Sequence, residues 1–150
     1  MPSETVGHVD AKSFVWLVLK ELADASGLDL HVLSDGVAVR IDERNANEPD
    51  CLVYVGPKLA GKALVVPAPV IVVEVASPSS GLRDRTNKRA DYFSLSSVEH
   101  YLVADPDRRA VLHFDRGNWK GEGRDLNEQD VLDLTPPGLR LPVRRCFSFR

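Results

Sequence analysis

The most distinctive pattern in the chain is an uninterrupted apolar run at residues 69–77, PVIVVEVAS, which contains one acidic residue, Glu74. Continuous β-branched residues are typical of a central strand that is covered on both faces. An ionised carboxylate in such a strand is costly unless it pairs with a cation. Glu74 is therefore expected to hold either a basic side chain or a metal ion.

Two helices are predicted on either side of this run. Apolar residues recur at helical spacing across residues 10–25, which indicates an amphipathic helix. The polar segment 83–95, RDRTNKRADYFSL, fits a second helix, and residues 77–81 fit a turn that caps it.

Shorter apolar or alternating runs predict the other strands, and polar segments between them predict loops. The further strands are 31–33, 37–41, 49–55, 100–104 and 110–114, the last two joined as a hairpin, and the loops are 42–49 and 56–68. The pattern weakens after Gly117. The order of helix, strands, helix and strands predicts one α/β domain over residues 1–150, with a mixed β-sheet flanked by helices. Two helices are too few for a doubly wound fold.

Composition is ordinary for a soluble globular protein, with 43% hydrophobic and 27% charged residues. No apolar run approaches the roughly 18–20 residues needed to span a bilayer. The first ten residues carry acids and no apolar segment typical of a signal peptide. We therefore expect a cytoplasmic protein with no membrane partner.

Charge and cysteine content disfavour several further classes of protein. The net charge of -3 argues against a general nucleic-acid binder, although basic residues gather locally at 83–89. Cys51 and Cys146 are isolated from each other in sequence, which disfavours a zinc site and, in a reducing compartment, a disulfide. Cys51 is expected to be a small core residue.

Asp50 and Glu74 are the residues with candidate chemistry. Asp50 opens one predicted strand and Glu74 lies on the next long one, and strands adjacent in sequence usually neighbour in space. Two carboxylates on one side make an oxygen-rich site of the kind that Mg²⁺ or Mn²⁺ prefers, with water and phosphate completing the coordination. The carbonyl of Val75 could add one oxygen, and a nearby lysine could orient or deprotonate an attacking water.

An ordered set of motifs resembles a known group. The chain is similar to the PD-(D/E)XK nuclease superfamily and, within it, to the Uma-two family of restriction endonuclease-like proteins. The matching segments are 49–50 (PD), 72–80 (VVEVASPSS), 84–92 (DRTNKRADY), 98–106 (VEHYLVADP) and 137–139 (PGL) with Phe147. The resemblance implies a restriction-endonuclease-like sheet and a Mg²⁺- or Mn²⁺-dependent endonuclease that hydrolyses DNA. A homodimer is a further expectation, because cutting two strands suits two-fold symmetry.

The resemblance also implies roles for single residues. Asp50 and Glu74 take the parts of the two acidic metal ligands, and Val75 adds its carbonyl. The superfamily lysine usually lies two residues after the second acid, where this chain has Ala76. In this family the lysine has moved to the following helix, which points to Lys88.

Other residues of that region take supporting roles under the same resemblance. The basic residues Arg83, Arg85 and Arg89 become candidate phosphate contacts. Ser77, Asp84 and Tyr92 become possible supports of the site, and the last two share one helix face with Lys88.

Alternatives stay open. Glu74 could form a structural ion pair, with Lys88 as one partner, and Lys88 could instead belong to a solvated helix face. Family members begin with a strand pair before the first helix, and this chain starts almost directly at that helix. A catalytically inactive nuclease-like module for binding or dimerisation is therefore the alternative function.

Overall fold

A six-stranded mixed sheet forms the centre of the protein. The structure is a computed structural model that describes residues 3–77 and 82–148. The strand order is β1-β4-β5-β6-β7-β8, in which β5 and β6 are parallel and the other neighbours are antiparallel. The strands are β1 (Leu30–Ser34), β4 (Cys51–Val55), β5 (Pro69–Val75), β6 (His100–Asp105), β7 (Ala110–Asp115) and β8 (Arg124–Leu126). The α/β class and the mixed sheet are confirmed.

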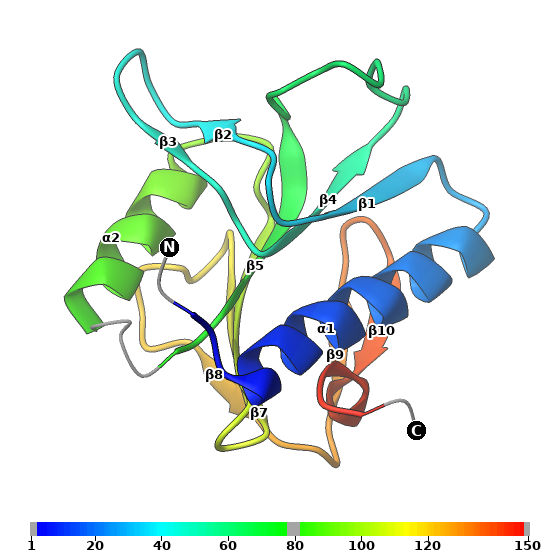
Figure 1. Ribbon diagram of the computed structural model, residues 1–150, viewed down its shortest axis with the longest axis vertical. Helices are drawn as coiled ribbons and strands as arrows, with labels where there is room; N and C mark the ends of the chain where they lie inside the picture. Colours follow the sequence, from blue (N-terminus) through cyan, green and yellow to red (C-terminus); the bar gives the residue numbers. More distant parts are fainter. Residues whose placement is uncertain (1–2, 78–81, 149–150) are drawn as a thin grey trace.

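Two helices cover opposite faces of the sheet (Figure 1). Helix α1 (Val6–Ala25) begins four residues earlier than expected, because the Thr5 side chain accepts a hydrogen bond from the His8 amide at 3.1 Å and caps it. Helix α2 (Leu82–Phe93) connects the two parallel strands β5 and β6. The turn expected at 77–81 lies, apart from Ser77, outside the described residues.

Alternation along β5 divides the core into two layers. Ile71 and Val73 are fully buried on the side of α1, whereas Val72 is buried on the side of α2 with Tyr92. Successive side chains of a strand point to opposite faces, so Glu74 shares the α2 side with Val72. The central, doubly covered strand predicted from the apolar run is confirmed.

The strand predicted at 37–41 and the loop at 42–49 need correction. Only β2 (Val39–Arg40) forms, and it pairs with β3 (Ala46–Asn47) inside the segment expected to be a loop. A tight turn explains both differences, since the Asp42 carboxylate accepts from the backbone amides of Arg44 and Asn45 at 2.8 and 2.9 Å.

The C-terminal part is more regular than the sequence pattern indicates. Strands β9 (Val131–Leu134) and β10 (Leu139–Pro142) pair as a separate antiparallel ribbon, followed by the 3₁₀ helix η1 (Val143–Cys146). Their buried leucines join the core beneath α1. Cys51 and Cys146 are both free and buried, as a small core residue requires.

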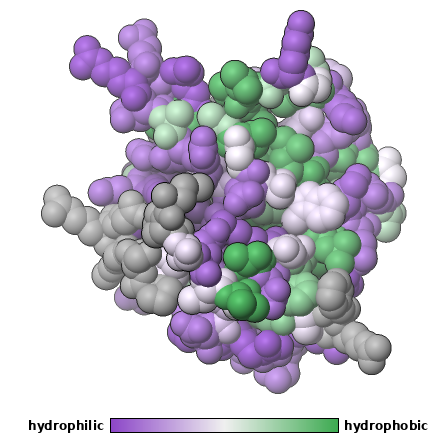
Figure 2. All heavy atoms as spheres, in the orientation of Figure 1, coloured by the Kyte–Doolittle hydropathy of each residue, from purple (hydrophilic) through white to green (hydrophobic). Residues whose placement is uncertain are grey.

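The outer surface is mainly hydrophilic on the face shown in Figure 2, with separate apolar patches between the polar residues. Within residues 3–77 and 82–148, we find no helix with the length and apolarity required to span a membrane.

Candidate functional site

Asp50 and Glu74 lie at adjoining strand ends, where β4 begins and β5 ends. Cys51 of β4 is paired with Val73 of β5, so continuing this antiparallel register by one residue places Asp50 opposite Glu74. The Asp50 carboxylate is anchored there, because its Oδ2 accepts a hydrogen bond from the backbone amide of Val75 at 2.7 Å. The predicted pair therefore lies at the same end of the sheet, with Asp50 lining a cavity beside α1 and Glu74 lining another beside α2.

Tyr92 holds the Glu74 carboxylate from α2. Its hydroxyl donates to Glu74 Oε1 at 2.9 Å, and its side chain is fully buried. Burial, followed by the charge of Glu74 and this hydrogen bond, raises the pKa of Tyr92 far above its usual range. Tyr92 is therefore a permanent donor that orients Glu74, in addition to its packing role.

Removing the Tyr92 hydroxyl should destabilise the fold. Tyr92→Phe should lower the free energy of unfolding by about 1–2 kcal/mol, because it deletes a buried hydrogen bond to a charged acceptor. Urea denaturation measures the change. Tyr54→Phe is the matched control, since the Tyr54 hydroxyl accepts from the Leu59 amide at 3.0 Å and that bond is between neutral groups. A Tyr92→Phe protein as stable as wild type would contradict the anchoring role.

Lys88 lies in the same small cavity as Glu74. The cavity has a volume of about 20 Å³ and is lined by Glu74, Val75, Ala76 and Lys88 together with Arg85, Tyr101 and Val103. That volume admits about one water molecule or ion. Lys88, on helix α2, therefore lines the same cavity as Glu74 and as Ala76, the residue two positions after it.

Arg85 and Arg89 line a second cavity of about 90 Å³ that adjoins the first. The guanidinium of Arg89 lies over the Phe114 ring at 4.2 Å from its centroid. The side chains of Arg83 and Asp84 lie outside what the structure describes. Ser77 is half-buried, two residues beyond the end of β5.

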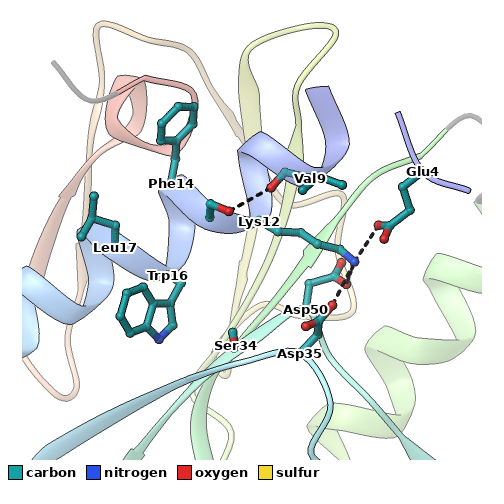
Figure 3. A pocket seen from close by; sticks show the side chains of 10 residues that line it. Glu4, Val9, Lys12, Phe14, Trp16, Leu17, Ser34, Asp35 and Asp50 are labelled. Atoms are coloured by element: carbon teal, nitrogen blue, oxygen red, sulfur yellow. Dashed lines mark hydrogen bonds and ion pairs between the residues drawn. The ribbon is translucent and has the colours of Figure 1, made fainter. Parts of the chain in front are cut away.

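Lys12 of α1 is a charged neighbour of Asp50 that sequence reasoning missed. Its Nζ lies 2.6 Å from Glu4 Oε1, 3.0 Å from Asp35 Oδ2 and 3.5 Å from Asp50 Oδ1. Figure 3 shows these side chains converging from the N-terminal segment, the turn after β1 and the start of β4. Helical periodicity places Lys12 on α1, but no sequence signal joins it to three acids from separate segments.

The four charged residues share a cavity of about 590 Å³ with apolar residues of α1. Burial by itself lowers the pKa of Lys12, but its hydrogen bonds to Glu4 and Asp35 and the charge of Asp50 outweigh burial and raise the pKa above the ordinary lysine value. Lys12 is therefore a fixed cation beside Asp50.

Comparison with known proteins assigns the fold and then the family. A solved structure described as "a putative nuclease belonging to DUF820 from Anabaena variabilis ATCC 29413" superposes with a TM-score of 0.74 at 16% identity, over 99% of this chain and 84% of that chain. The chain thus has the fold of that protein. A search of curated proteins found no match. The Uma2 family model, described as "Putative restriction endonuclease", matches residues 1–144, and the chain belongs to this family.

Proposed function

We propose that the protein is a metal-dependent endonuclease that hydrolyses DNA phosphodiester bonds. The observation that carries the proposal is the placement of Asp50 and Glu74 at adjoining strand ends. The Asp50 carboxylate is bonded to the Val75 amide, and Glu74 lines an ion-sized cavity together with Lys88. Membership of the Uma2 family supports the same reaction class.

Mg²⁺ or Mn²⁺ fits this donor set. Among residues 3–77 and 82–148, no three His, Cys, Asp or Glu side chains come together as a metal site. The proposed ligands are instead the carboxylates of Asp50 and Glu74 with the carbonyl of Val75. Few protein ligands suit Mg²⁺, which usually keeps several waters and binds substrate phosphate through them or directly.

When bound, the metal would supply an activated water and offset the negative charge that develops on the phosphate. The chain's own groups hold the arrangement in place. The Val75 amide fixes Asp50, and the Tyr92 hydroxyl fixes Glu74. The Lys88 ammonium would orient the attacking water or stabilise the developing charge, and Arg85 and Arg89 would bind neighbouring phosphates.

One observation favours the second candidate, a catalytically inactive module. The Asp50 carboxylate already has the Val75 amide on one oxygen and the Lys12 ammonium 3.5 Å from the other. These partners offset its charge without a metal, as a purely structural acid would need.

A nuclease assay tests the proposal directly. The purified protein should nick plasmid or cut oligonucleotides with Mg²⁺ or Mn²⁺, and Asp50→Asn should lower the rate by about 100-fold or more, because it removes a charged ligand while keeping its shape. Asp24→Asn is the matched control, as Asp24 is exposed and pairs with Lys20 elsewhere on α1.

Two outcomes would contradict the proposal. Cleavage that persists in both Asp50→Asn and EDTA would show that the site is elsewhere. Saturable Mn²⁺ binding without any cleavage of single- or double-stranded DNA would favour the inactive module.

A further inference from the structure

The cavity beside Asp50 has an unusual balance of charge. Among the described residues that line it, the charged ones are the acids Glu4, Asp35 and Asp50 and one base, Lys12, so acids exceed bases by two. Such a cavity attracts cations and repels phosphate. The cation nearest to Asp50 is nevertheless part of the chain itself.

The Lys12 ammonium is held in this position by its backbone and its partners. Ala11 and Val15, on the same helix, are buried in the core, which fixes the path of α1. The Lys12 side chain is only 18% exposed, and that of Asp50 only 16%. Charges shielded from water interact more strongly than exposed ones, so the ammonium acts on anything that binds at Asp50.

We propose that Lys12 is a built-in competitor of the divalent ion at Asp50. In the metal-free protein its ammonium offsets the charge of Asp50, and a metal must displace it or bind against its repulsion. Its contacts with Glu4 and Asp35, at 2.6 and 3.0 Å, are shorter than the 3.5 Å to Asp50. The ammonium therefore keeps two carboxylate partners when it yields Asp50.

This inference rests on the proposed metal site. It also predicts the direction in which metal affinity changes when Lys12 is replaced, which the site alone does not predict. A residue that merely positions Asp50 would help metal binding, and its loss would weaken affinity. A competing cation does the opposite, since its removal leaves Asp50 with more negative charge to offer the metal.

Titration of the metal alone tests the sign. Lys12→Met should bind Mn²⁺ about tenfold more tightly than wild type. Electron paramagnetic resonance of free Mn²⁺, or calorimetry, measures the affinity. Lys12→Arg keeps the cation and should stay within about threefold of wild type. Lys20→Met is the matched control, because Lys20 has the same charge on the same helix and pairs with Asp24 away from the site.

A second variant guards against loss of folding. Lys12→Gln is uncharged but polar, and circular dichroism with urea denaturation establishes that each variant is folded before titration. Tight binding in Lys12→Met or Lys12→Gln that disappears when Glu74→Ala is added would support the inference.

Two results would overturn the inference, and only the second would also refute the proposed metal site. Unchanged or weaker Mn²⁺ affinity in both uncharged variants would refute the competitor role and leave a metal site that binds in wild type intact. Absence of Mn²⁺ binding in wild type and in both variants would refute the metal site and the competitor role together.

Discussion

Replacing Glu74 by glutamine should lower the proposed metal-dependent cleavage by about 10³-fold or more and leave the protein at least as stable as wild type. Glutamine keeps the length of the side chain and an oxygen that can accept the Tyr92 hydroxyl. It lacks the charge that a divalent ion needs and that a largely apolar strand does not favour. Activity and stability should therefore change independently.

This pair of measurements separates a ligand from a structural ion. If Glu74 served mainly as the partner of a buried base, its neutralisation would leave that base unpaired and cost several kcal/mol. Plasmid nicking and urea denaturation of one preparation give both values. Glu43→Gln, at an exposed turn between β2 and β3, is the control for the chemical change. A Glu74→Gln protein that is strongly destabilised would favour the structural ion pair.

Local pattern predicted the part of the site that depends on neighbouring strands. The apolar run around Glu74 predicted β5, and the alternation of side chains along that strand determines on which face of the sheet the Glu74 carboxylate lies. Asp50 lies at the adjoining strand end because β4 and β5 are consecutive long strands in antiparallel pairing. Lys88 could be placed because α2 directly follows β5 and crosses the same face.

Lys12 shows where such reasoning ends. Its three carboxylate partners come from the N-terminal segment, from the turn after β1 and from the start of β4. Periodicity gives the face of α1, but the packing of α1 against the sheet decides what that face meets. Strand β3 and its pairing with β2 were missed for a related reason, since they depend on side-chain contacts of Asp42 within the turn.

The histidines are a further case. Two of them meet inside the sheet although they are 13 residues apart in the chain. The β6–β7 register pairs His113 with Leu102, two residues from His100 on the same face. His100 Nδ1 and His113 Nε2 are 2.9 Å apart, and both side chains are buried.

Geometry determines the protonation state of this pair. His100 Nε2 lies 2.8 Å from the carbonyl oxygen of Pro136, which can only accept, so Nε2 carries a proton. Neutral His100 then accepts through Nδ1, and His113 must donate from Nε2. His113 Nδ1 is left as a buried lone pair with no hydrogen-bond partner among the described residues. The bonded pair thus requires at least one of the two histidines to be neutral.

Acid should consequently destabilise the fold through this pair. Burial, and next the neighbouring His100, lowers the pKa of His113 to about 4, and burial also lowers the pKa of His100 despite its bond to Pro136. A histidine whose pKa is lower in the folded state takes up protons preferentially when unfolded. The contribution of the histidine pair to the free energy of unfolding is present above the ordinary histidine pKa of about 6.5 and is lost as pH falls toward 4.

The His113→Gln variant should measure this contribution. Glutamine can keep an N–H donor near the position of Nε2 but does not titrate, so the fall in stability between pH 7 and pH 4 should be smaller than in wild type by about 2 kcal/mol. Urea denaturation across this range gives the comparison, and subtracting the two curves removes the shared titration of carboxylates. His31→Asn is the control, because His31 is partly exposed and pairs with Asp29 at the surface. A His113→Gln curve parallel to that of wild type would show that the histidine pair has no part in acid sensitivity.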